Sequence, residues 1–113
     1  MANTVYKILG QLDSTGTTNQ DIYTVPTTPA TNTIVSTIVI TNRSLANQSY
    51  SILVRKNGAS AANAQYIAYN SPVPALDAVA LTLGLSLGAN DVITANSSTA
   101  YNVSFNIFGT ELS

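Results

Sequence analysis

The alternation of apolar and polar residues along this chain has a period of two over most of its length. Such alternation over four to eight residues is typical of a β-strand with one buried face. It predicts eight strands, at residues 5–12, 21–25, 33–41, 48–56, 64–69, 79–83, 91–95 and 101–108. Turn-forming residues separate these segments, so the expected fold is an all-β antiparallel sandwich of the jelly-roll or immunoglobulin-like type, in a single domain spanning residues 1–113.

The segment 33–41 is the clearest predicted strand. Strict alternation places four residues on one face and four on the other: Ile34, Ser36, Ile38 and Ile40, against Val35, Thr37, Val39 and Thr41. Both faces are rich in β-branched side chains, which favour packed surroundings. A central strand that is covered on both sides is therefore expected here.

Two segments allow other interpretations. Leu76, Val79, Leu83 and Leu87 have helical spacing in part, but the glycines and the alternation of VALTLGLSL favour a strand. The sequence Ser71-Pro72-Val73-Pro74 is expected to interrupt the sheet, because proline donates no backbone hydrogen bond and restricts the residue before it.

The chain carries few charged residues for its size. Only 8 % of the 113 residues are charged, with four Lys or Arg and five Asp or Glu, for a net charge of −1. A nearly neutral surface favours association, so neighbouring subunits are expected to cover part of it. Four scattered cations argue against nucleic-acid binding, and no apolar run is long enough to form a membrane helix.

Few residues of the chain are suited to catalysis or metal binding. The chain has no His and no Cys, so an enzyme is not expected, and no catalytic residue, cofactor or metal ligand is assigned. The carboxylates are expected to stabilise turns and strand ends. They are Asp13, Asp21, Asp77, Asp91 and Glu111. Calcium at Asp13-Ser14-Thr15 is the alternative that remains.

Tyrosine is favoured both in interfaces and in sugar-binding sites, so the six tyrosines are candidates for either role. Tyr66 and Tyr69 are three residues apart, which places them on opposite faces of a regular strand. At most one of the two is then expected in the core.

Three stretches resemble small virion structural proteins of tailed bacteriophages, including those that infect cyanobacteria. They are IYTVPTTPATNTIVSTIVITN, QYIAYNSPVPALDAVALTLGLSLGANDVI and VSFNIFGTELS, and the resemblance runs from about residue 22 to the end. The matching positions look like scaffold residues: Tyr23, Val25, Pro26, Val35, Ser36, Thr37, Ile38, residues 81–84, Asp91, Val92 and residues 108–111. The resemblance implies a protein that is made in the host cytoplasm and located in the virion.

These observations lead to the hypothesis of a capsid decoration or cement subunit that binds the major capsid protein or other virion subunits, with a homotrimer as the expected form. The expected contact arm contains Tyr23, Val25, Pro26, Thr27, Thr28, Pro29 and Thr31. The first few residues form a second expected arm, and residues 57–63 an exposed tip. The alternative is a tail, baseplate or fibre module that attaches to host-surface glycans.

Overall fold

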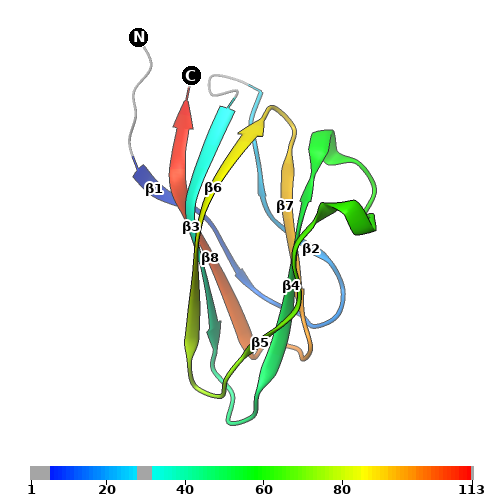
Figure 1. Ribbon diagram of the computed structural model, residues 1–113, viewed down its shortest axis with the longest axis vertical. Coiled ribbons are helices and arrows are strands. Elements are labelled where there is room, and N and C mark those ends of the chain that lie inside the picture. The colour runs from blue at the N-terminus through cyan, green and yellow to red at the C-terminus, as the bar shows by residue number, and fades with distance from the viewer. Residues whose placement is uncertain (1–5, 28–31, 113) are drawn as a thin grey trace.

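The computed structural model describes residues 6–27 and 32–112, which form two antiparallel sheets packed face to face (Figure 1). The strands are β1 (Tyr6–Asp13), β2 (Gln20–Thr24), β3 (Asn32–Asn42), β4 (Gln48–Arg55), β5 (Tyr66–Val73), β6 (Ala78–Gly88), β7 (Val92–Ser97) and β8 (Val103–Leu112). Two short 3-10 turns, η1 (Lys56–Gly58) and η2 (Asn63–Gln65), connect β4 to β5. Within these described ranges, no helix is long and apolar enough to cross a membrane.

The strand order shows how the chain wraps. One sheet, called the β3 sheet, has the order β1-β8-β3-β6, and the other, called the β4 sheet, has the order β2-β7-β4-β5. The pairs β1–β8, β2–β7, β3–β6 and β4–β5 are those of one long antiparallel hairpin that has been rolled up. The expected all-β sandwich is confirmed, and this order is that of a jelly roll rather than an immunoglobulin fold.

The core lies between the two sheets. Phe105 on β8 is fully buried, and its ring meets that of Tyr50 on β4 edge-to-face, with centroids 6.2 Å apart. Ile38, Ile52 and Ile107 are fully buried around them. Each such side chain stabilises the fold by about 1.5–3 kcal/mol through its removal from water, so contacts across the sandwich hold the sheets together.

A bulge in β3 changes the face on which its first residues lie. The pairing of β3 with both neighbours shifts register between Val35 and Thr37, and Ser36 Oγ donates a hydrogen bond to the carbonyl of Phe108 at 3.2 Å. Val35 is therefore buried with Ile38, whereas Ile34 is 38 % exposed. The predicted grouping of Ile34 with Ile38 was wrong, because strict alternation does not allow for the extra residue of a bulge.

The central position predicted for this strand is confirmed, since β3 lies between β8 and β6. Cover on both faces is not found within the described chain. Thr37, Val39 and Thr41 point away from the core and are half-exposed.

Two other strands run further than predicted. β5 continues through Pro72 to Val73, so the expected interruption of the sheet was wrong; β5 is an edge strand, where proline is tolerated. The strand interpretation of the VALTLGLSL segment is confirmed, and β6 extends to Gly88 instead of ending at Leu83.

Candidate interaction surfaces

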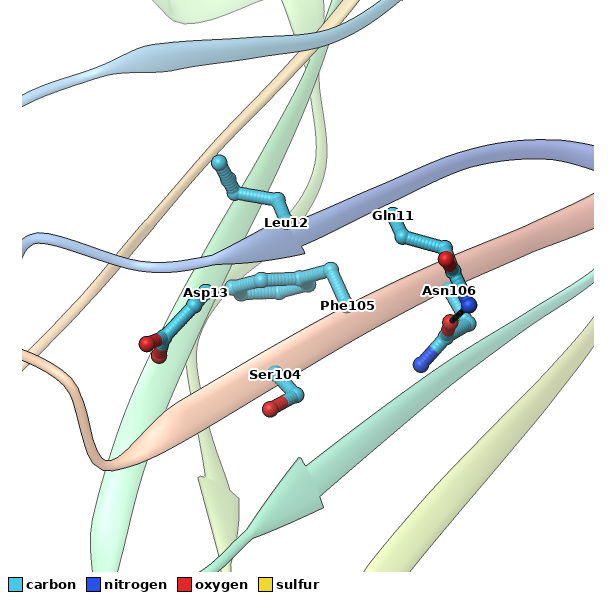
Figure 2. Close-up of a pocket in the computed structure, with 6 residues that line it drawn as sticks. All are labelled: Gln11, Leu12, Asp13, Ser104, Phe105 and Asn106. Carbon is cyan, nitrogen blue, oxygen red and sulfur yellow. Dashed lines mark hydrogen bonds between the residues drawn. The ribbon is translucent and has the colours of Figure 1, made fainter.

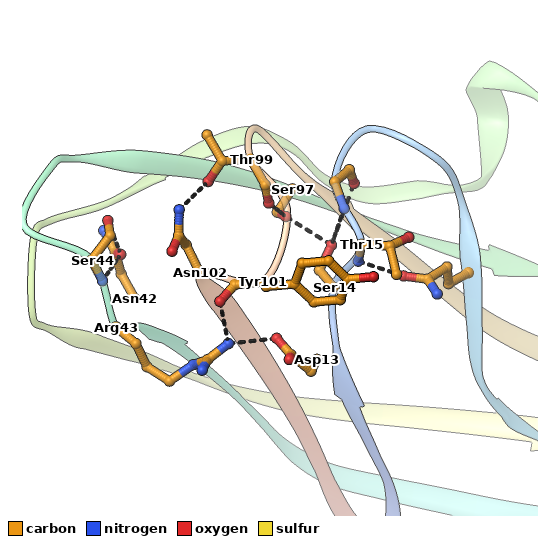
Figure 3. Close-up of polar contacts among 12 residues, drawn as sticks. Asp13, Ser14, Thr15, Asn42, Arg43, Ser44, Ser97, Thr99, Tyr101 and Asn102 are labelled. Atoms are coloured by element: carbon orange, nitrogen blue, oxygen red, sulfur yellow. Dashed lines mark hydrogen bonds and ion pairs between the residues drawn. The ribbon is translucent and has the colours of Figure 1, made fainter.

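A network of hydroxyl and backbone groups closes the loop between β1 and β2 against the loop between β7 and β8 (Figure 3). The buried Ser97 Oγ lies 2.7 Å from Ser14 Oγ, which is also buried. The backbone N–H of Ser97 donates to the carbonyl of Gly16 at 2.9 Å, and that of Tyr101 donates to the carbonyl of Ser14 at 2.7 Å. The Ser14 hydroxyl therefore serves the fold rather than a ligand.

The carboxylate of Asp13, at the same end of the molecule, forms an ion pair with the guanidinium of Arg43 (Figure 3). Arg43 also donates to the carbonyl of Tyr101 at 2.7 Å. A cation beside the carboxylate opposes calcium binding, because the two positive charges repel. Among the described residues, no three acidic side chains come together in a metal-binding group.

The other four carboxylates also contact groups of the fold. Asp21 pairs with Arg55 at 2.8 Å, Glu111 pairs with Lys7 at 2.8 Å, Asp77 accepts from the backbone N–H of Ala78 at 2.8 Å, and Asp91 accepts from those of Asn57 and Gly88 at 2.8 Å each. These contacts fit the structural role expected for the carboxylates at turns and strand ends.

Tyr23 on β2 reaches across the sandwich to the β3 sheet. Its hydroxyl donates a hydrogen bond to the carboxylate of Glu111 and lies 2.8 Å from Thr33 Oγ1. Burial, followed by the hydrogen bond to Glu111, raises the pKa of the Tyr23 phenol to about 12. Hydrogen bonds from Lys7 and then from Tyr23 lower the pKa of Glu111, so Tyr23 stays neutral and Glu111 stays charged at neutral pH.

Only part of the expected contact arm lies within the described residues. Val25 is buried in the core, with 1 % exposure, and its backbone N–H donates to the carbonyl of Asp91 at 2.9 Å. Tyr23 and Pro26 are half-buried, and Thr27 is exposed. Three further members of the arm, Thr28, Pro29 and Thr31, lie outside the described residues, as do the first five residues of the chain. Contact of this arm with a partner stays a prediction.

The middle of the outer face of the β4 sheet is covered by the chain itself. Leu53 and Thr94 point away from the core, yet they are 0 % and 2 % exposed. The Arg55 side chain lies beside them, with Nε donating to Thr94 Oγ1 at 3.0 Å and Nη2 to Asp21 at 2.8 Å. Its Nη1 donates to the carbonyl of Ala59 at 3.1 Å, which ties the β4–β5 connection to the sheet.

The outer face of the β3 sheet, by contrast, has no such cover within the described chain. It is four strands wide, and the strand registers place the following residues on it: Ala78, Ala80, Thr82, Gly84 and Ser86 of β6; Ile34, Thr37, Val39 and Thr41 of β3; Ser104, Asn106, Phe108 and Thr110 of β8; and Tyr6, Ile8, Gln11 and Asp13 of β1. Asp13, at one end, is the one charged residue among these, and Arg43 neutralises it.

A shallow depression marks the polar end of this outer face (Figure 2). It lies between β1 and β8, has a volume of about 310 Å³, and is lined by Gln11, Leu12, Asp13, Ser104, Phe105 and Asn106. The side-chain amide of Gln11 donates to Asn106 Oδ1 at 2.7 Å across the strand pair. The amide and carboxylate groups of the depression make this end hydrophilic without a net charge.

The opposite end of the outer face is apolar. Tyr6 is 69 % exposed, Ile8 54 % and Ile34 38 %, and Phe108 lies among them, half-buried. We call these four residues the apolar patch. Ile8 pairs directly with Phe108, and Tyr6 and Ile34 flank Thr110 on β8. The sequence analysis did not find the patch because its members come from three strands and only the register of the sheet brings them together.

A second cavity lies outside the sandwich, against β5 and η2. It has a volume of about 330 Å³ and is lined by Asn63, Tyr66 and Tyr69; we call it the aromatic pocket. The tyrosine rings meet edge-to-face with centroids 4.8 Å apart. The two residues thus share a face, and the expected placement on opposite faces was wrong, because the pairing of β5 with β4 shifts register twice. Neither ring is in the core, and Tyr69 is 64 % exposed.

Comparisons with known proteins show a shared fold. No family model and no curated protein matches the sequence. Among solved structures, the chain is similar to a chain in the structure of infectious bursal disease virus, Gx strain, with a TM-score of 0.52 and 8 % sequence identity. The match covers 99 % of this chain and 31 % of that one, so this chain spans about a third of the length of its viral neighbour. At such low identity, the two share their fold alone.

Proposed function

We propose that this chain is a non-enzymatic structural subunit of a tailed-bacteriophage virion, which decorates the capsid and reinforces the joints between capsid subunits. The observation that carries the proposal is the open, nearly uncharged outer face of the β3 sheet, with the apolar patch at one end. Contiguous exposed apolar surface on a soluble domain marks a site of association. The fold shared with a chain of a virus structure and the resemblance of the sequence to phage virion proteins add support.

The dimensions of the outer face suit a repeated contact of modest strength. Four strands at about 4.8 Å spacing, and four rows of side chains along them, give an area on the order of 500 Å². Stable protein interfaces bury roughly 1,200–2,000 Å² in total from both partners, so this face alone, which would bury about 1,000 Å² in total, falls just below that range. Many copies on one particle compensate for weak individual contacts, because several contacts act together on the same capsid.

The proposed partners are the major capsid protein or other virion subunits, together with further copies of the chain. The apolar patch would be buried in the contact, and the polar depression at the other end of the face would supply amide and carboxylate hydrogen bonds. Low charge suits this role, since few ion pairs need to be desolvated when the face is covered.

The first experiment is the location of the chain in intact virions by cryo-electron microscopy, combined with binding to capsids that lack it. Density at capsid joints is the expected result, and density confined to the tail contradicts a decoration role. An Ile8→Asp variant is expected to lose most capsid binding, because the new charge must be desolvated in the contact. Leu45→Asp is the matched control, since Leu45 is 87 % exposed in the loop between β3 and β4.

A second candidate function rests on the aromatic pocket: attachment of a tail, baseplate or fibre to a host-surface glycan. Exposed tyrosine rings stack on the apolar faces of sugars, and the amide of Asn63 can exchange hydrogen bonds with sugar hydroxyls. Tyr69 is 64 % exposed and Tyr66 is half-buried, so both rings border solvent at this pocket.

A glycan array separates the two functions. Under this second proposal, binding to a subset of glycans is expected to disappear in Tyr69→Ala and to persist in Tyr101→Ala, whose ring is 62 % exposed elsewhere on the molecule. Absence of binding by the unmodified chain, or equal loss in the two variants, contradicts a sugar site at the aromatic pocket.

A further inference from the structure

The sandwich has four sheet edges, and three of them carry features that discourage pairing with another strand. β1 contains Lys7 and a register shift beside Gly10, β2 has only five residues, and β5 contains Pro72 and two register shifts. Charged residues, short length, proline and bulges are the devices by which natural sheets protect their edges. The contrast with the fourth edge, β6, is therefore informative.

β6 (Ala78–Gly88) has 11 residues with no charge and no proline, and within the described chain it pairs with β3 alone (yellow in Figure 1). One register shift relative to β3 occurs near Gly84, but the alternation of exposed and covered residues continues through it without a break. The backbone N–H and C=O groups along the other side of β6 form a long template for a further strand.

The side chains of β6 also favour such pairing. The residues that point away from the core are small: Ala78, Ala80, Thr82, Gly84 and Ser86. Those that point inward are aliphatic and, except for the buried Leu87, only half-buried: Val79, Leu81, Leu83 and Leu85. An added strand would meet no bulky outer side chain, and its own inward row would complete the cover of these aliphatic residues.

We propose that β6 pairs antiparallel with β6 of a second copy of this chain, which joins two β3 sheets into one eight-stranded sheet about a two-fold axis. An antiparallel pair of identical strands is self-complementary, because each contact occurs twice across the axis. The second copy therefore offers the same small outer residues and the same half-buried aliphatic row.

Charge supports this arrangement over a parallel one. Asp77 directly precedes β6 and is exposed. Eleven residues span about 36 Å, so antiparallel pairing separates the two Asp77 carboxylates by roughly that distance, whereas in-register parallel pairing would bring them together. Opposed like charges destabilise a strand pair, and the antiparallel pair avoids them.

The expected strength is modest. An edge of about 36 Å by roughly 12 Å buries on the order of 900 Å² from both copies, which is below the range of standard interfaces. Pairing is therefore expected to depend on protein concentration. The result is a two-fold pair rather than the trimer expected from the sequence, and the inference holds whether or not the chain belongs to a virion.

The absence of cysteine from the sequence permits a direct test with single thiols. In an antiparallel pair centred near the middle of β6, the two copies of a Thr82→Cys thiol lie within about 7 Å, whereas those of an Ala78→Cys thiol lie about 30 Å apart. A short bismaleimide should therefore give at least about fivefold more covalent dimer with Thr82→Cys, since the local thiol concentration is far higher. Both positions are exposed, so both variants keep the core intact.

Similar cross-linking at the two positions would indicate parallel pairing and overturn the proposal. Cross-linking of Thr82→Cys no greater than that of Thr24→Cys, an exposed position on β2, would also overturn it. As a second measurement, sedimentation equilibrium is expected to show a concentration-dependent shift toward twice the monomer mass. Thr82→Lys should abolish this shift by placing two cations at the axis, and Thr24→Lys should leave it unchanged. A constant monomer mass, or a trimer, contradicts the two-fold pair.

Discussion

The hydroxyl of Tyr23 on β2 donates a hydrogen bond to the carboxylate of Glu111 on β8, and so connects the two sheets at one end of the sandwich. Lys7 on β1 completes the contact from the other side of the carboxylate, at 2.8 Å. Thr33 on β3 adds its hydroxyl 2.8 Å from that of Tyr23. Four strands therefore meet in one polar contact at the end of the molecule where the contact arm begins.

Replacement of Glu111 by Gln is expected to lower the free energy of unfolding by about 1 kcal/mol at pH 7, because it removes a partly buried ion pair and a charged acceptor. The pKa of Glu111 is lowered in the folded protein, so the carboxylate contributes its full stability above the usual value of 4.5. That contribution disappears as the pH falls through the folded pKa. Urea unfolding should therefore show that Glu111→Gln lowers the free energy of unfolding less at pH 3 than at pH 7.

Asp77→Asn is the control, because that exposed carboxylate accepts a hydrogen bond from its own neighbour, Ala78, and makes no ion pair in the described chain. Asp77→Asn should change the free energy of unfolding little at both pH values. A cost for Glu111→Gln that is equal at pH 7 and pH 3 would show that the carboxylate charge contributes nothing to folding.

The sequence was sufficient to predict the strands and the class of fold, because alternation is a local property of each strand. β8 illustrates this: alternation over residues 101–108 puts Tyr101, Val103, Phe105 and Ile107 on one face, and the last three are fully buried. Tyr101 was wrongly included, since it precedes β8 and is 62 % exposed. Bulges could not be predicted from the sequence. An extra residue such as Ser36 in β3 is accommodated by the neighbouring strands, and the local alternation of apolar and polar residues does not reveal it.

The candidate surfaces were harder to predict than the fold, for the same physical reason. The apolar patch joins Tyr6, Ile8 and Ile34, which are brought together only by the pairing of β1, β8 and β3. The aromatic pocket depends on the irregular pairing of β5, which turns Tyr66 and Tyr69 to one side. Long-range register is set by packing and turns, and a single sequence contains no direct signal for it.

Gly109 on β8 is predicted to tolerate no side chain. A Cβ at this position would lie 2.2 Å from the carbonyl oxygen of Ile34 and 3.0 Å from Cα of Val35, at the bulge of β3. Because both contacts are backbone atoms, relief requires the strands to separate. Gly109→Ala is therefore expected to reduce the free energy of unfolding by about 2–3 kcal/mol or more, as in other overpacked interiors.

The matched control is Gly84→Ala in β6, where an added Cβ would meet no atom of the described chain within 4 Å. It should be neutral or slightly stabilising, by up to about 1 kcal/mol, because alanine restricts the unfolded chain. Thermal and urea unfolding measure both variants. Equal stability of the two variants would contradict the close approach of β8 to the bulge of β3.

Thr110 on β8 offers the opposite prediction, a substitution that stabilises the protein. Its side chain is 1 % exposed, and Oγ1 has no hydrogen-bond partner among the described residues. Valine has nearly the same shape and lacks the hydroxyl, so Thr110→Val should raise the free energy of unfolding by about 1 kcal/mol. Thr33→Val is the matched comparison: Thr33 is equally buried, but its hydroxyl contacts Tyr23, so this variant should lose about 1 kcal/mol. Urea unfolding of the two variants should therefore give changes of opposite sign, and a loss of stability in both would show that the Thr110 hydroxyl is bonded in solution.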